Sequence, residues 1–339
     1  MVLTDIVDMT ENDTPLTLQE MPDPTSASNE IIIKVHTCGV CHTELDEIEG
    51  RTPPSSYPRI LGHQVVGRVI ESGKSAYRFK PGTRVGVAWI YSTCGKCTFC
   101  LSEQENLCPE FRATGRDAHG GYAEYLNIAE DFALKIPQEF SDTEAAPLLC
   151  AGAIGYRSLS LTNLQNGQNL GLAGFGASAH LVIKLVQNLY PDSKIFVFSR
   201  TEKEREFALE LGASWAGNFS ERSPKLLNSI IDTTPVWKPV LISLRNLAPG
   251  GRLVINAIRK ENIDQHLLAE IDYPKELWLE KEIKSVANVT RKDVKDFLEI
   301  ASRIPLKPEV QEFELEEANI ALSELKSRKI RGAKILRIS

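Results

Sequence analysis

The sequence lacks a surplus of basic residues. Its 39 Lys and Arg residues face 45 Asp and Glu residues, which gives a net charge of −6 at pH 7 and an isoelectric point near 5.7. A protein that binds nucleic acid or an anionic lipid surface needs an excess of positive charge to neutralise phosphates. The composition therefore argues against nucleic-acid partners and favours small molecules.

Long apolar segments are also missing. Residues 1–13 lack the basic flank and the apolar run of a secretory signal peptide. Nowhere do about 18 uncharged apolar residues follow one another, the length that a membrane-spanning helix requires. We therefore expect no membrane partner and a cytoplasmic location.

The order of local patterns predicts two domains of an α/β protein. A chain of 339 residues is of the length expected for about two domains. β-branched runs at residues 31–35 and 65–70 indicate short strands, and long amphipathic helices are scarce before about residue 142. Further along, predicted strands at 169–174, 194–199, 229–234 and 252–257 alternate with predicted helices at 177–190, 203–212 and 238–251. Such alternation predicts a doubly wound parallel sheet.

Domain boundaries follow from this change of pattern. We expect a β-rich domain over residues 1–147 and the parallel-sheet domain over residues 148–290. A tail over residues 291–339 is expected to return to the first domain. Its helix pattern runs from residue 291 to residue 303, and a final strand is predicted near residues 333–338.

The spacing of four cysteines gives the strongest motif. Cys94, Cys97, Cys100 and Cys108 fall within fifteen positions, as CxxCxxC followed by a fourth Cys. One loop with this spacing can surround a tetrahedral ion, and four thiolates leave no position open for a substrate. A structural zinc site is the preferred interpretation. A [4Fe–4S] cluster and idle cysteines are the alternatives.

A second set of candidate ligands is dispersed along the chain. Two cysteines and one histidine, Cys41, His63 and Cys150, form a three-ligand zinc set that would leave a fourth position for water or an alcohol oxygen. Spacing alone does not establish such a site, because isolated Cys and His residues are more often buried or exposed without a metal.

Several motifs together resemble the zinc-dependent branch of the medium-chain alcohol dehydrogenase family. They occur in the family's order over nearly the whole chain. The resemblance implies a GroES-like catalytic domain and a Rossmann domain, with zinc and the nicotinamide cofactor in a cleft between them. The motifs are GVCHTE (39–44), GHQVVG (62–67), the four-cysteine loop (94–108), GGYAEY (120–125), CAG (150–152) and GLAGFGASAH (171–180).

Metal and proton-transfer roles follow from the resemblance. Cys41, His63 and Cys150 would hold a catalytic zinc, which acts as a Lewis acid on the alcohol or aldehyde oxygen, and the four clustered cysteines a structural zinc. Thr43 would hydrogen-bond the substrate oxygen and begin a proton relay, and Glu44 would orient a ligand histidine.

Three residues near these motifs depart from the family pattern or have no ligand role. Gln64 replaces a glutamate found in many relatives, and Asp46 stands where some relatives have the relay histidine, so that Asp46 or water would accept the proton. Cys38 is interpreted as a packing residue.

A glycine-rich turn predicts the dinucleotide site. Gly171, Gly174, Phe175 and Gly176 follow a strand-like run and precede a helix, with Ala173 in place of the middle glycine of GxGxxG. Backbone amide groups at such a turn can face a pyrophosphate.

Cofactor selectivity is predicted from the next strand. It ends in Ser199 and Arg200 without an acidic residue, a combination that suits a 2′-phosphate and predicts NADP(H) in preference to NAD(H). By resemblance, His42 and Arg291 would contact the pyrophosphate.

The resulting interpretation is an NADP(H)-dependent alcohol dehydrogenase or aldehyde reductase with one catalytic and one structural zinc. Trp89 and Ile90 are candidates for an apolar substrate pocket, but core positions are equally plausible for both. By analogy with relatives the protein is expected to be a homo-oligomer, a dimer or a tetramer. The alternative is a noncatalytic NADP(H)-binding zinc protein with a sensing or structural role.

Overall fold

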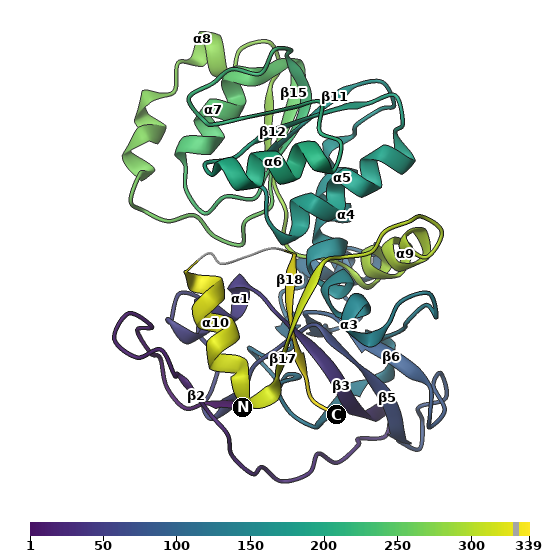
Figure 1. Cartoon of the computed structure of the whole chain (residues 1–339). Coiled ribbons are helices and arrows are strands. Elements are labelled where there is room, and N and C mark those ends of the chain that lie inside the picture. The colour runs from purple at the N-terminus through teal and green to yellow at the C-terminus, as the bar shows by residue number, and fades with distance from the viewer. Residues whose placement is uncertain (328–331) are drawn as a thin grey trace. The chain divides into compact units, whose positions relative to one another are not determined.

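The computed structural model describes residues 1–327 and 332–339, which form two compact units (Figure 1). The first unit comprises residues 1–153, 289–303 and 307–339, and the second comprises residues 154–288 and 304–306. The C-terminal tail thus lies with the N-terminal residues. In the described residues no helix combines the length and the apolar character needed to cross a membrane.

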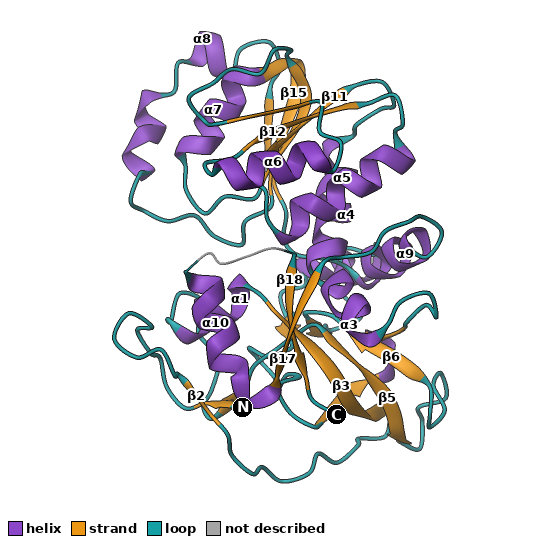
Figure 2. Ribbon diagram, viewed as in Figure 1, coloured by secondary structure: helices purple, strands orange, loops and turns teal. Residues whose placement is uncertain are grey.

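The first unit is built on a mostly antiparallel sheet with the order β10-β6-β5-β3-β18-β17, and β9 also pairs with β3. Strands β3, β5, β6, β17 and β18 of this sheet are labelled in Figure 2. Its strands are β1 (Val2–Leu3), β2 (Leu16–Thr17), β3 (Glu30–Val40), β4 (Arg59–Ile60), β5 (Val65–Ser72), β6 (Arg84–Val87), β7 (Ile90–Ser92), β8 (Arg112–Ala113), β9 (Tyr125–Ala129), β10 (Ala133–Lys135), β17 (Val310–Glu314) and β18 (Ala333–Arg337).

Short helices connect these strands. They are α1 (His42–Ile48), α2 (Thr98–Leu101), η1 (Glu105–Leu107), η2 (Glu130–Phe132), α3 (Asp142–Ala145), η3 (Ala146–Leu149), α9 (Arg291–Ala301), η5 (Leu315–Glu317) and α10 (Ala318–Lys326). Helix α4 (Ala151–Thr162) begins in the first unit and continues into the second.

Strand β3 forms the centre of the first sheet. It pairs with β5, β9 and β18, all antiparallel. Its β-branched residues Ile31, Ile33 and Val35 are fully buried in the hydrophobic core, which explains why this run favours a strand. At the C-terminal end of β3 the chain passes directly into Cys41 and α1, so the central strand positions the first candidate ligand.

The second unit contains a parallel sheet with the order β13-β12-β11-β14-β15-β16. Its strands are β11 (Asn169–Ala173), β12 (Lys194–Phe198), β13 (Trp215–Gly217), β14 (Leu227–Asp232), β15 (Leu247–Ile255) and β16 (Glu282–Ser285), and its other helices are α5 (Ala177–Leu189), α6 (Glu202–Glu210), α7 (Lys238–Asn246), η4 (Gln265–Glu270) and α8 (Tyr273–Glu276). This is the predicted doubly wound arrangement.

The parallel strands are added to the sheet first on one side of β11 and then, from β14 onward, on the other side. From β11 the chain moves outward to β12 and β13, and then returns to β14 on the other side of β11. Ligands of open parallel sheets bind at the carboxyl ends of strands next to such a switch point. Gly174, Ser199 and Thr233 follow directly after β11, β12 and β14 and therefore meet at this edge.

One predicted helix is shorter than expected. The segment 238–251 was expected to form a helix that Gly250 and Gly251 close, but α7 ends at Asn246 and β15 begins at Leu247. The pairing of β14 with β15 shifts register between Leu227 and Ser229, which accommodates the Ala-Pro-Gly-Gly stretch inside the strand. A helix would lose a backbone donor at Pro249, and two glycines follow it.

Candidate active site and cofactor turn

Three side chains from distant parts of the first unit converge as predicted. Cys41 caps the N-terminus of α1, His63 lies between β4 and β5, and Cys150 follows η3. His63 Nε2 lies 3.6 Å from Cys41 Sγ and 3.2 Å from Cys150 Sγ, and the three ligand atoms all lie within 4.8 Å of one another. Zinc bonds of about 2.0–2.3 Å set neighbouring tetrahedral ligand atoms about 3.3–3.8 Å apart, so this cluster fits one zinc ion.

Glu44 connects two members of the cluster. Its Oε2 accepts a hydrogen bond of 2.8 Å from the backbone N–H of Cys41, and its Oε1 lies 2.6 Å from His63 Nδ1. Both side chains are buried. A carboxylate at Nδ1 fixes the ring so that Nε2 faces the two sulfurs, which is the orientation that a histidine ligand of zinc requires.

Burial and mutual proximity shift the protonation of these ligands. The hydrogen bond with Cys150 and burial raise the pKa of Cys41 well above the ordinary value. Burial opposes charge on His63, but the carboxylate of Glu44 and the sulfur of Cys41 favour its protonated form and raise its pKa. Since a bound cation needs deprotonated ligands, it must displace these protons, and zinc affinity will rise with pH.

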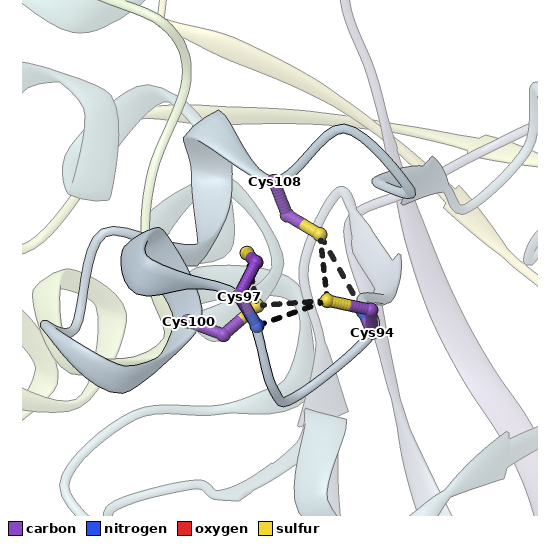
Figure 3. Close-up of side chains that lie close together, drawn as sticks. All are labelled: Cys94, Cys97, Cys100 and Cys108. Atoms are coloured by element: carbon purple, nitrogen blue, oxygen red, sulfur yellow. Dashed lines mark hydrogen bonds between the residues drawn. The ribbon is translucent and has the colours of Figure 1, made fainter.

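The four-cysteine loop also closes on itself, as Figure 3 shows. Cys94 Sγ lies 3.5 Å from Cys108 Sγ and 3.9 Å from Cys100 Sγ, and Cys97 Sγ lies 3.5 Å from Cys100 Sγ. Backbone N–H groups of Lys96 and Cys97 lower the pKa of Cys94 to about 6. A preorganised set of four thiols with N–H donors to sulfur fits a structural zinc site.

Other residues that the resemblance singled out lie close to the first cluster. Thr43 is half-buried in the first turn of α1 and donates its backbone N–H to Cys41 Sγ at 3.3 Å. His42 is the first residue of the same helix and is exposed. The side chain of Gln64 packs on Gly39, where an added Cβ would lie 2.6 Å from Gln64 Oε1. Cys38 is fully buried in the hydrophobic core, as its packing role predicted.

Asp46 has an ionic partner that the sequence did not predict. Its Oδ1 accepts a bond of 2.5 Å from Arg51 Nε. Arg51 also pairs with Glu49, which in turn pairs with Lys326 at 2.6 Å. The carboxylate at position 46 is therefore held by a cation.

Sequence reasoning missed two buried carboxylates in the first unit. Glu47 is fully buried, and neither of its carboxylate oxygens has a hydrogen-bond partner among the described residues. Glu105 is also buried, and its Oε1 accepts the backbone N–H of Arg291 at 2.9 Å and Arg291 Nε at 3.1 Å. The Arg291 guanidinium also lies over the ring of Phe132, 4.8 Å from its centroid. No sequence signal marks Glu47, while Glu105 lies three residues before Cys108.

The glycine-rich turn of the second unit revises the predicted register of the motif. Gly171 lies inside β11, where an added Cβ would meet Leu227 and Ile230 at 2.7 and 2.9 Å, so its role is packing. The turn itself has Gly174, with φ +86°, and Gly176 at the N-cap of α5. The GxGxxG/A pattern is therefore Gly174-x-Gly176-x-x-Ala179, with a buried alanine as its last member.

Phe175 is buried beneath this turn. Its ring packs edge-on against Phe207 of α6, with centroids 5.7 Å apart. The Phe175 side chain therefore holds the turn against α6, and only its backbone remains a candidate for contact with a cofactor.

The end of β12 carries an acidic neighbour that was not expected. Ser199 is buried, and its hydroxyl donates a hydrogen bond to a carboxylate oxygen of Glu204 in α6. Arg200 is exposed. Arg205 Nη1 donates to the backbone oxygens of Ser199 and Arg200 at 3.0 and 2.9 Å. An acidic group therefore does reach the strand end, from one turn further along the chain.

Comparisons with known proteins agree with this geometry. The sequence profile of the alcohol dehydrogenase GroES-like domain matches residues 27–138. A probable alcohol dehydrogenase of Mycobacterium tuberculosis, AdhA, is 41% identical over 320 residues, which covers 93% of this chain and 90% of that protein.

Solved structures share the fold. A structure described as an NAD-dependent alcohol dehydrogenase has a TM-score of 0.87 at 21% identity, with 100% of this chain and 99% of that chain covered. CAD from Helicobacter pylori, complexed with NADP(H), has a TM-score of 0.80 at 22% identity, with 91% and 90% covered. The similarity to the Mycobacterium protein, together with the zinc-type clusters and the two folds, establishes that this chain belongs to the zinc-dependent medium-chain alcohol dehydrogenase family and is a zinc-type oxidoreductase.

Proposed function

We propose that the protein transfers a hydride between NADP(H) and a small alcohol/aldehyde pair. The observation that carries this proposal is the Cys41–His63–Cys150 cluster, which offers three protein ligands and is oriented by the buried Glu44. Sites with three protein ligands are typical of catalytic zinc, whereas the complete thiolate set of the four-cysteine loop is typical of structural zinc.

The bound groups supply the central chemistry. Zinc supplies Lewis acidity toward an alcohol or carbonyl oxygen, and the nicotinamide ring accepts or donates the hydride. Side chains of the protein are proposed to transfer the proton of the substrate hydroxyl group. Thr43, next to the ligands in α1, is the proposed hydrogen-bond partner of the substrate oxygen. Asp46 is the proposed next proton acceptor, and its carboxylate also accepts a hydrogen bond from Arg51.

The cofactor proposal rests on the carboxyl edge of the parallel sheet. Gly174 and Gly176 leave backbone amide groups of the turn and of α5 for a pyrophosphate. Arg200 is the proposed contact of the 2′-phosphate. His42 and Arg291 remain proposed pyrophosphate contacts. The guanidinium of Arg291 also donates a hydrogen bond to Glu105.

A noncatalytic NADP(H)-binding protein is the less favoured alternative. A purely structural role would need only the four-cysteine loop, whereas the second cluster with its carboxylate–histidine pair is the arrangement of a catalytic centre. A homo-oligomeric state, a dimer or a tetramer, and a cytoplasmic location remain predictions.

Trp89 and Ile90 were the two candidates for the wall of an apolar substrate pocket. Ile90 is fully buried in the hydrophobic core, so it is a packing residue. Trp89 is also buried, 5.2 Å from the ring of Phe111 and beneath the guanidinium of Arg116 at 5.1 Å. Of the two candidates, Trp89 alone remains for a pocket wall.

An aldehyde panel tests the proposed function. Zinc-replete protein is assayed for NADPH and NADH oxidation with short aliphatic, branched and aromatic aldehydes. We expect turnover with several aldehydes, and turnover that falls at least about 100-fold in Cys150→Ala, which removes one ligand. The absence of turnover on every aldehyde, in protein that holds two zinc ions per chain, would contradict the proposal.

A further inference from the structure

The hydroxyl of Ser199 is already engaged at the predicted 2′-phosphate position. Thr201 caps α6 by accepting the backbone N–H of Glu204 at 3.2 Å. In a complete capping box the Glu204 carboxylate would return this bond to the backbone of Thr201. It instead accepts the hydroxyl of Ser199, the first residue after β12.

The charges at this strand end are therefore mixed. Arg200 is exposed at the start of the loop. A second cation, Arg205, is turned toward the backbone, because its Nη1 donates to the carbonyl oxygens of residues 199 and 200. Glu204 places a negative charge within hydrogen-bond reach of the hydroxyl that a 2′-phosphate would contact.

We propose that Glu204 is a specificity-determining residue that limits the preference for NADP(H) and keeps NAD(H) usable. The inference rests on the proposed function, since it assumes that a nicotinamide dinucleotide binds along the carboxyl edge of the parallel sheet. It goes beyond that proposal by assigning a residue that opposes Arg200.

The chemistry of the two cofactors gives the direction of the effect. The 2′-hydroxyl of NAD(H) can donate to a carboxylate, so Glu204 can replace its bond to Ser199 with a bond to the ribose. The 2′-phosphate of NADP(H) is an anion without a comparable donor, and it would meet both Coulomb repulsion and an occupied Ser199 hydroxyl. Arg200 attracts the same phosphate, so the two side chains act against each other.

A variant that removes the charge of Glu204 but keeps the shape of its side chain tests this inference. In Glu204→Gln the amide oxygen still accepts from Ser199, but the negative charge is gone. Fluorescence titration of NADH and NADPH with the zinc-replete protein gives both dissociation constants without a substrate. We expect Glu204→Gln to tighten NADPH binding about tenfold relative to NADH, and the effect to shrink as the salt concentration rises.

Glu202→Gln is the matched control. It removes the same charge from the first turn of the same helix, at an exposed position, and it should change the ratio of the two constants less than about threefold. Glu204→Ala repeats the test without an acceptor, and circular dichroism checks that each variant is folded. If the ratio of the NADPH and NADH dissociation constants is the same in Glu204→Gln, Glu204→Ala and the unaltered protein, the proposed role of Glu204 is overturned. Unaltered protein that binds neither dinucleotide would overturn the proposed function itself.

Discussion

At the scale of single residues, Glu44 has the largest expected effect on metal binding. Its two carboxylate oxygens contact the backbone of Cys41 and the ring of His63, so it orients two proposed ligands at once. Such carboxylates stabilise a bound metal by fixing ligand orientation and by compensating charge.

We predict that Glu44→Gln lowers zinc affinity at the Cys41–His63–Cys150 cluster by about 10- to 100-fold, because the negative charge beside the imidazole is lost. Competition with a zinc chelator measures the affinity. Glu47→Gln is the control, since it neutralises a buried carboxylate of the same helix whose oxygens have no hydrogen-bond partner among the described residues. Equal zinc affinities in the two variants would show that Glu44 has no orienting role.

Glu47 itself gives a prediction about pH and stability. Burial and the neighbouring Glu44 raise the pKa of Glu47 well above its ordinary value. Folding therefore opposes ionisation of Glu47, and this cost grows as the pH rises above the unfolded-state pKa of about 4.3. We expect Glu47→Gln to stabilise the protein at pH 7 by on the order of 1 kcal/mol and to have no effect well below pH 4. Thermal unfolding across this pH range measures the difference, and a variant that is less stable at pH 7 would contradict the account.

At the scale of elements, the four-cysteine loop is connected to helix α9. Glu105 lies between Cys100 and Cys108, and its carboxylate accepts both the backbone N–H and the Nε of Arg291, the first residue of α9. A carboxylate at a helix N-terminus is stabilising because unpaired N–H groups face it. The loop therefore holds the end of the helix in addition to its proposed metal.

Removal of this carboxylate should loosen α9. We predict that Glu105→Ala lowers the free energy of unfolding by about 1–3 kcal/mol, because the half-buried guanidinium of Arg291 and a helix-end N–H lose their acceptor. Hydrogen exchange should accelerate in residues 291–301. The control is Glu103→Ala at an exposed position of the same loop, which should change stability by less than about 0.5 kcal/mol. Unaltered exchange of α9 in Glu105→Ala would refute the connection.

Two glycines near the cofactor turn, Gly171 and Gly176, are expected to differ in role, one in packing and the other in cofactor binding. An added Cβ at Gly176 meets no atom within 4 Å, whereas one at Gly171 meets the side chains of Leu227 and Ile230. We expect Gly176→Ala to keep its stability within about 0.5 kcal/mol and to bind NADPH at least about tenfold more weakly, since the methyl group occupies space near the helix amides. Gly171→Ala should lose about 1–3 kcal/mol of stability and bind NADPH normally once folded. The reverse pattern would restore Gly171 to the cofactor site.

At the scale of the whole molecule, the sequence predicted elements better than contacts. β-branched runs and alternating patterns located β3, β5 and the parallel sheet because each depends on neighbouring residues. Cys41, His63 and Cys150 are far apart in the sequence, so only the resemblance to a family brought them together.

Two errors of the sequence interpretation have physical causes. Glycines at 171, 174 and 176 fit the fingerprint in more than one register, and only the end of β11 decides between them. Glu204 received no role at the cofactor site because only the strand end was searched for an acidic residue, while the carboxylate comes from the first turn of the following helix. Side chains that reach back across a turn leave no trace in local patterns.

The central claim is that this chain binds two zinc ions, one of them through Cys41, His63 and Cys150. Elemental analysis of zinc-replete protein after removal of excess metal tests it directly. We predict two zinc ions per chain in the unaltered protein and in Cys38→Ala, whose thiol is a buried packing group, and one in Cys41→Ala. A single ion in the unaltered protein, retained in Cys41→Ala, would contradict the account, because the four-cysteine loop would then be the sole metal site.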